Sequence, residues 1–178
     1  AMLASIAIVA IAAFAVLWLV SVHRRLSILD ENIDSAMNQL GVQLSCRFDS
    51  LMSLLELIKS FSPCESEALI QAVNFRRGAI SAKSTPAEVL RQEAAISEAL
   101  KWIETITEQR PALRESPDYI RAMDAMETFD SMVRISRLIY NESVARLNQE
   151  IRSFPVSLVA ELLGFRQREY LELTSEPM

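Results

Sequence analysis

Turn-forming residues are scarce in this chain of 178 residues, which contains three glycines and six prolines while 51% of its residues are hydrophobic. A fold of many short strands needs glycine and proline at regular intervals between the strands, so this composition excludes such a fold and favours long helices. The length provides for one domain with a proper core and leaves no room for a second large one. The sequence therefore predicts an all-α protein.

Histidine and cysteine are also scarce, and their positions exclude most metal chemistry. A di-iron site in a helical bundle needs paired Glu-x-x-His motifs, whereas the sole histidine of this chain is His23. Cys46 and Cys64 do not form a Cys-x-x-Cys pair and have no histidine nearby in sequence, so they cannot complete a zinc site. We expect both thiols to be packing residues in a reducing compartment, and we predict no metal and no cofactor.

Basic clusters and catalytic motifs are absent from the sequence as well. A nucleic-acid binder needs clustered lysine and arginine, so a net charge of −5 without such a cluster argues against a nucleic-acid partner. No Gly-x-Ser-x-Gly elbow, Walker A loop or Gly-x-Gly-x-x-Gly turn is present to hold a nucleophile or a phosphate. Asp130 is expected to pair with Arg134 four residues later. Seven carboxylates are interpreted as solvated: Glu93, Glu98, Glu104, Glu108, Asp124, Glu127 and Asp130. The sequence therefore predicts a protein that is not an enzyme.

A long uncharged run stands at the start of the chain. No charged residue lies between Met2 and Val22, and about 20 apolar residues suffice to cross a bilayer as a helix. Trp18 suits the headgroup region, and the basic residues 23–25 follow at once. A cleaved signal peptide, the alternative, would have a basic start, a shorter apolar stretch and a small-residue cleavage site. We predict a retained anchor over residues 2–22 that contacts the lipid bilayer, with the N-terminus outside and the following domain in the cytoplasm.

Apolar residues then recur at steps of three and four, the period of a helix with one buried face. The spacing predicts a helix over residues 26–61, with Gly41 as the one weak point along it. Because neither proline nor glycine lies between residues 20 and 30, we expect this helix to be continuous with the anchor. Its apolar stripe comprises Leu26, Leu29, Ile33, Met37, Leu40, Leu44, Phe48, Leu51, Leu55 and Ile58.

Three more helices are predicted after the first. Ser62 and Thr85 each precede a proline and lie three residues before a glutamate, which is a helix start signal. We expect the first of these helices to run toward Gly78 and the second to end before Pro111. The fourth helix begins at Ser116 and carries a heptad-like apolar stripe. That stripe comprises Tyr119, Met123, Met126, Val133, Tyr140, Val144, Leu147, Ile151 and Phe154.

Four helices joined by short connections, each with an apolar face, predict an antiparallel four-helix bundle over residues 23–171. A short C-terminal helix should begin at Pro155 and end at Gly164, which suits a left-handed cap. We expect Phe154 and Phe165, at its two ends, to pack inward. Residues 172–178 form an acidic tail that we expect to be flexible.

Two stretches of the chain resemble a known protein family. Residues 140–173, YNESVARLNQEIRSFPVSLVAELLGFRQREYLEL, are similar to the C-terminal end of the LemA family of bacterial membrane proteins. Residues 42–61 are similar to its first soluble helix, and Pro111 and Leu113 fit a Pro-x-Leu turn between the two. The matching positions include Gln43, Arg47, Asp49, Tyr140, Asn141, Asn148, Arg152, Phe154, Pro155, Gly164 and Phe165.

The resemblance implies an N-terminal span in a bacterial inner membrane followed by a cytoplasmic helical bundle, and it implies no reaction. Three places depart from the family's pattern. Gly41 stands where an acidic residue is usual, residues 45–46 where basic residues are usual, and residues 52–53 where Pro-Asn is usual. A binding role of those positions therefore does not carry over.

Polar residues follow one edge of the fourth helix. Arg134, Asn141 and Asn148 are spaced by seven, and Gln43 and Arg47 on the first helix could face them. Polar groups at a bundle seam discriminate against slipped pairings, so we predict interhelical hydrogen bonds that determine register. The alternative is a site for a partner or a lipid headgroup.

The C-terminal helix has a functional alternative too. If its hydrophobic residues left one side exposed, it would form a docking surface for a partner. The residues concerned are Val156, Leu158, Val159 and Leu162.

Together these features predict a membrane-tethered interaction or scaffold module with a protein partner at the membrane. The sequence leaves two alternatives open. One is a membrane organiser that self-associates through its span, in which Ala4 and Ala7 would allow close helix contact. The other is an accessory subunit of a membrane enzyme or transporter.

Overall fold

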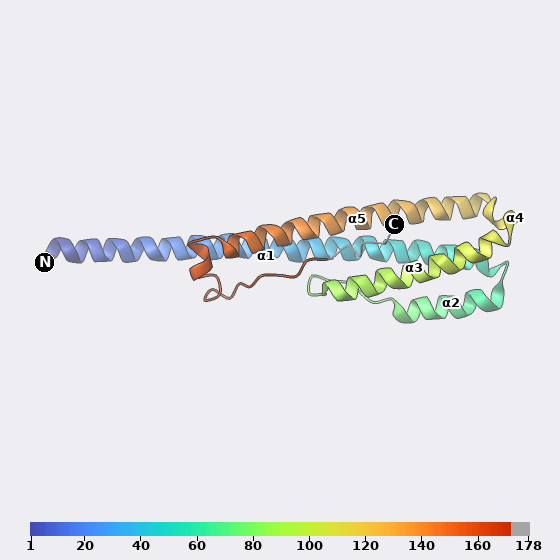
Figure 1. Cartoon of the computed structure of the whole chain (residues 1–178), viewed down its shortest axis with the longest axis horizontal. Coiled ribbons are helices and arrows are strands. Elements are labelled where there is room, and N and C mark those ends of the chain that lie inside the picture. Colours follow the sequence, from blue (N-terminus) through green and yellow to red (C-terminus); the bar gives the residue numbers. More distant parts are fainter. Residues whose placement is uncertain (172–178) are drawn as a thin grey trace.

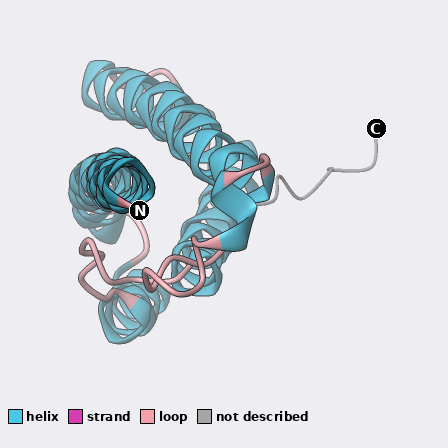
Figure 2. Ribbon diagram, turned by 90° about the vertical axis from the view of Figure 1, so that its left-hand side faces the viewer, coloured by secondary structure: helices cyan, strands magenta, loops and turns pink. Residues whose placement is uncertain are grey.

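The computed structural model describes residues 1–171, and the predicted flexible tail at 172–178 lies outside this range. Figure 2 shows the described residues as helices joined by loops, without a strand. The prediction of an all-α protein is confirmed for this part of the chain. The elements are α1 (Met2–Lys59), α2 (Pro63–Arg76), α3 (Pro86–Glu108), α4 (Pro111–Arg114), α5 (Pro117–Arg152) and a short 3-10 helix, η1 (Val156–Leu158).

Helix α1 is unbroken over 58 residues. Residues 2–17 of α1 are exposed on every side, Trp18 and Leu19 are half-buried, and Val22 is the first buried residue. From there to Ile58 the predicted apolar stripe is buried, apart from half-buried Leu29. The prediction that residues 2–22 and the first bundle helix form one continuous helix is confirmed, and Gly41 does not interrupt it.

The starts of the other helices follow the sequence signals. Thr85 accepts a hydrogen bond from the Glu88 backbone N–H, while the Glu88 carboxylate accepts one from the Thr85 N–H at 2.6 Å. This is the capping box that the sequence predicts. Pro63 and Pro117 occupy first-turn positions, where a missing N–H costs nothing. The side chain of Ser62 instead donates to the Glu65 carboxylate at 3.1 Å.

The α1–α5 pair forms the long axis of the domain, and the chain reverses direction at each step from α1 to α2, α3 and α5 (Figure 1). Helices α2 and α3 pack beside α1, and α4 makes the corner between α3 and α5. With 14 residues, α2 covers only part of the length of α1. The domain is therefore a long antiparallel α1–α5 pair with the shorter helices α2 and α3 beside it, rather than the predicted bundle of four long helices.

The chain after α5 differs from the prediction of a helix from Pro155 to Gly164. Only Val156–Leu158 form a helical turn, and turns continue to Gly164. Such a short segment cannot hold a regular helix by backbone hydrogen bonds alone, and its path depends on buried Val156 and Ala160. We call this segment the 153–165 turn. After it, the backbone runs without helix or strand to Leu171, back along α1 (Figure 1).

The predicted cap at Gly164 is confirmed. Gly164 has φ +88°, the left-handed region that glycine adopts at no steric cost. The N–H of Phe165 donates to the Ala160 carbonyl, and that of Gly164 to the Glu161 carbonyl, both at 3.0 Å. These are the two hydrogen bonds of a Schellman motif.

Candidate functional site

Asn141 and Asn148 hold the C-terminal segment rather than facing α1 as predicted. The Asn148 amide donates to the Arg168 carbonyl at 3.0 Å and accepts from the Arg168 N–H at 2.8 Å. Asn141 pairs in the same two-way manner with Leu171, at 2.9 and 2.8 Å. An asparagine side chain offers a donor and an acceptor side by side, so each amide satisfies both polar groups of one residue in an extended chain.

The spacing of the two asparagines matches the extended chain that they bind. Seven helical residues rise about 10.5 Å, and three extended residues span about 10 Å. Asn141 and Asn148 can therefore bind Leu171 and Arg168, three residues apart, only if the segment runs antiparallel to α5. The hydroxyl of Tyr140 adds a donor to the Glu169 carbonyl at 3.2 Å. A phenol with an ordinary pKa is already protonated at neutral pH, and burial raises the pKa of this one further, so the hydroxyl is a donor.

The other side of the segment is bound to α1. The Arg168 guanidinium lies 3.2 Å from Asp30 and 2.8 Å from Asp34, and Lys83 reaches Asp34 at 3.4 Å. Burial alone would lower the pKa of Arg168, but hydrogen bonds to Asp34 and Asp30 raise it above its ordinary value. We call Asn141, Asn148, Arg168, Asp30 and Asp34 the C-terminal clamp, because together they bind residues 168–171 between α5 and α1.

Sequence reasoning missed Arg168, Asp30 and Asp34. A signal was present in the two aspartates, because like charges four residues apart on one helix repel each other unless a cation lies between them. That pattern indicates an arginine or lysine close to both aspartates. It could not indicate which one, since Arg168 is more than 130 residues away along the chain.

A layer of buried and half-buried charges, with exposed Arg134 at its edge, joins α1, α3 and α5, and we call it the polar layer. The interpretation of Glu93 and Asp130 as solvated is therefore wrong for these two carboxylates. Arg47, only 7% exposed, lies 3.0 Å from Asp130, which also binds Arg134 at 3.0 Å. Arg137 of α5 lies 3.2 Å from Glu93 of α3. The predicted pair of Asp130 with Arg134 is confirmed, and Arg47 joins this pair across the seam.

Burial governs the electrostatics of the polar layer. It lowers the pKa of Arg47, against the opposing field of Asp130, and it raises the pKa of Glu93, against that of Arg137. Within residues 1–171, Arg47 Nε and Gln43 Oε1 are buried without a hydrogen-bond partner. Breaking a buried pair leaves an uncompensated charge, so this layer discriminates against any shifted packing of α1 on α5.

Asp49 contacts the loop after α2. Its carboxylate lies 2.8 Å from Arg77, and the same guanidinium donates to the Ser45 hydroxyl at 3.0 Å and lies 5.4 Å from the Phe48 ring centroid. Ser45 departs from the family's usual basic residue, and here it accepts a hydrogen bond from a basic side chain of another element. Arg77, which binds the loop after α2 to α1 through Asp49 and Ser45, was not identified from the sequence.

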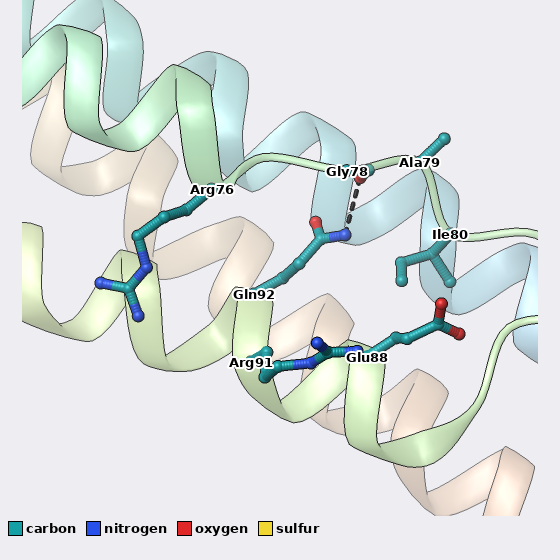
Figure 3. A pocket seen from close by; sticks show the side chains of 7 residues that line it. All are labelled: Arg76, Gly78, Ala79, Ile80, Glu88, Arg91 and Gln92. Carbon is teal, nitrogen blue, oxygen red and sulfur yellow. Dashed lines mark hydrogen bonds between the residues drawn. The ribbon is translucent and has the colours of Figure 1, made fainter.

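A hollow of about 350 Å³ lies between the end of α2, the following loop and the first turns of α3 (Figure 3). Gln92 crosses it and donates to the Gly78 carbonyl at 2.7 Å. On the α1 side, a Cβ atom at Gly41 would lie 2.5 Å from the Ile80 carbonyl oxygen. Gly41 therefore permits the loop to lie directly on α1, and the hollow marks where this loop is seated.

The two ends of the 153–165 turn behave differently. The Phe165 ring packs edge-on against His23, with 5.5 Å between centroids, and is half-buried. Phe154 is 81% exposed, so the prediction that both aromatics pack inward is wrong for this one. Phe154 lies just after α5 ends, where the chain turns at Pro155 away from the stripe. Arg152 donates from Nε to the Asn148 carbonyl at 3.3 Å.

These residues carry no reactive constellation. Within residues 1–171 there is no group of three or more His, Cys, Asp or Glu side chains that could hold a metal ion. Cys46 and Cys64 are free thiols; Cys46 is half-buried, whereas Cys64 is exposed, so the prediction of a packing role is wrong for Cys64. The polar layer joins α1, α3 and α5, and the clamp binds residues 168–171 between α5 and α1.

One comparison with known proteins is informative. The family model described as LemA family matches residues 36–177, which include the polar layer, the 153–165 turn and the clamp except for Asp30 and Asp34. No curated protein matches the chain. The match covers most of the sequence and agrees with the resemblance seen in residues 42–61 and 140–173. The chain therefore belongs to the LemA family.

Proposed function

We propose that this protein is a non-enzymatic interaction module, tethered by residues 2–22 to the cytoplasmic face of a bacterial membrane. The observation that carries the proposal is the continuity of α1. One helix supplies both the bare apolar stretch, long enough to cross a bilayer, and the central element of the folded domain.

Continuity has a mechanical consequence. A flexible linker would let the domain rotate freely over the membrane, whereas an unbroken helix transmits the position and tilt of the span to the domain. Tethering raises the effective concentration of the domain toward other proteins of the same membrane. The basic residues 23–25, directly after the span, support the cytoplasmic orientation.

The surface of α5 supports an interaction with another protein. Four apolar side chains on the side away from the core are 42–60% exposed. They recur at steps of three and four, so they form one strip along the helix. Contiguous exposed apolar surface marks interaction sites. The strip comprises Met132, Ile135, Leu138 and Ile139.

The experiment is crosslinking of the full-length protein in its native membrane, followed by mass spectrometry. We expect a near-stoichiometric protein partner that is lost in an anchor-deleted form and in an Ile135→Asp, Leu138→Asp variant. A variant with Phe75→Asp, on exposed α2, is the matched control and should retain the partner. Capture of the protein alone, in discrete multiples, would replace this proposal with a self-associating membrane organiser.

A further inference from the structure

Helix α5 returns toward the end of the domain from which the apolar stretch of α1 extends. Because α1 and α5 are antiparallel (Figure 1), the residues after Arg152 lie beside the start of the buried part of α1. Two contacts establish this: Arg25 lies 3.6 Å from Glu150, and the ring of His23 packs on Phe165. The 153–165 turn is therefore at the same level as residues 23–25.

This level coincides with the edge of the apolar stretch. Residues 2–22 span about 31 Å as a helix, close to the thickness of about 30 Å of a hydrocarbon core. The domain already buries part of Trp18 and all of Val22, so it begins to cover α1 before the apolar stretch ends. If α1 spans the membrane, the end of the domain must lie against the lipid headgroups.

The turn presents large apolar side chains at this end. Phe154, Leu158 and Leu162 are 81%, 67% and 85% exposed. Val156 and Ala160, which alternate with them, are buried and fasten the turn to the domain. The exposed side chains thus belong to a well-anchored segment. In water alone this arrangement leaves three hydrophobic side chains uncovered for no structural gain.

The charge at this end suits an anionic surface. Residues 23–25 and 150–166 include four arginines and two glutamates, in a chain whose net charge is −5. Arg152 and Arg166 are exposed and form no ion pair within residues 1–171. Both line a hollow of about 680 Å³ beside the turn, together with Glu161 and Phe165. Guanidinium groups are suited to the phosphate of a lipid headgroup.

We propose that the 153–165 turn is a second membrane contact, in which Phe154, Leu158 and Leu162 insert among the lipids while Arg152 and Arg166 bind anionic phospholipid headgroups. This inference rests on the proposed anchoring of α1. It assigns to the turn the role of holding the domain at one orientation against the bilayer. An amphipathic segment of this kind reaches about 5–10 Å into the boundary between headgroups and acyl chains.

The test uses the full chain with Cys46 and Cys64 replaced by serine and a fluorophore on a single introduced cysteine. Leu158→Cys and Leu162→Cys report on the turn, Phe14→Cys on the span, and Phe75→Cys on an exposed site of α2 far from the turn. Each protein is reconstituted in vesicles of phosphatidylcholine and phosphatidylglycerol that contain a nitroxide-labelled lipid. All four positions are exposed, so the labels leave the core intact, and circular dichroism verifies the helical content.

We expect strong quenching by the nitroxide lipid, roughly half of the fluorescence or more, for labels at Leu158 and Leu162 at the depth of an interfacial segment and for a label at Phe14 within the span. The label at Phe75 should remain unquenched. In an Arg152→Gln, Arg166→Gln background, quenching at Leu158 should fall to the level seen in phosphatidylcholine alone.

Other outcomes overturn specific parts of the inference. Quenching at Phe14 but not at Leu158 and Leu162 would overturn the second contact and leave the anchor intact. Absence of quenching at Phe14 would overturn the anchor and the contact together. A label at Leu158 that is shielded from aqueous iodide yet unquenched by lipid would assign the turn to a protein contact. Quenching that does not depend on phosphatidylglycerol or the arginines would refute the headgroup site.

Discussion

The two parts of α1 differ in how their apolar residues are arranged around the helix. Residues 2–17 are apolar on every side and are covered by nothing in the folded chain, whereas residues 22–58 bury one stripe and expose polar side chains elsewhere. A helix that is apolar all round requires either a protein interior or a bilayer. The comparison shows that apolar side chains on every side of the helix suit residues 2–17 to a bilayer, whereas a single apolar stripe suits residues 22–58 to packing in a folded domain.

The largest expected effect contrasts two phenylalanines of the same helix. Phe48→Ala removes a ring that is fully buried and should lower the free energy of unfolding of the domain by about 3–5 kcal/mol. Phe14→Ala is the matched control, because this ring is 73% exposed and should leave unfolding of the domain unchanged. Chemical denaturation of the full chain in detergent micelles measures both. Equal losses for the two variants would contradict the division of α1.

The next effect contrasts two valines of α1, and here the substitution in the apolar stretch is the one with a consequence. Val9→Arg places a charge in the middle of the apolar stretch and should cost about 2.5–3.5 kcal/mol of membrane insertion, without altering the unfolding of the domain. Val42→Arg, on the exposed face of the domain part, should leave insertion unchanged. Glycosylation-mapped insertion into microsomes measures the fraction inserted. If the Val9→Arg protein inserted as well as the wild type, the prediction that residues 2–22 span the membrane would be contradicted.

A smaller effect concerns the clamp that binds the C-terminal segment to the domain part of α1. Asn148→Ala leaves the polar backbone groups of Arg168 without their partners and should lower stability by about 1–3 kcal/mol. Asn38→Ala, at an exposed position of α1, is the control. Hydrogen exchange should accelerate at the amides of residues 168 and 171 in the Asn148 variant, and unchanged exchange there would mean that the segment is held by other contacts.

The smallest effect is a pH dependence from the polar layer. Burial raises the pKa of Glu93 above its ordinary value of 4.5, despite the nearby Arg137 and Arg47. The folded chain therefore binds this proton more tightly than the unfolded chain, so the contribution of Glu93 is most favourable below pH 4.5 and declines as pH rises through the raised pKa. As pH rises through this range, the free energy of unfolding of the wild type should therefore decrease relative to that of the Glu93→Gln variant, which has no carboxylate to titrate. Parallel profiles would show that Glu93 titrates normally.

The sequence was informative wherever structure depends on neighbours along the chain. Periodicity predicted α1 and α5, proline signals predicted the starts of α2, α3 and α5, and Gly164 was identified as a left-handed cap. Each of these depends on residues within a few positions of one another. The continuity of the span with the domain was predicted in the same way, from the lack of a helix breaker between residues 20 and 30.

Contacts between distant segments were predicted less well. The spacing of Asn141 and Asn148 was recognised, but their partners were sought on a helix because nothing marked residues 168–171 as an extended segment. Gly41 was interpreted as a weak point, whereas it allows the loop at Ile80 to lie on α1. Phe154 continued the stripe of α5 by spacing, yet the helix ends two residues before it. In each case a tertiary partner decided the outcome.

The length of α1 also defines a height. From residue 23 to Lys59 the helix rises about 55 Å, so the corner that holds α4 and the start of α2 would stand that far above the bilayer if the span is upright. A shallow neighbour in the membrane could touch only the lower part of α5, near Ile139. If the chain binds partners at the cytoplasmic face as proposed, only proteins with tall cytoplasmic domains would reach the upper corner, and the length of α1 would then select partners by their height above the bilayer.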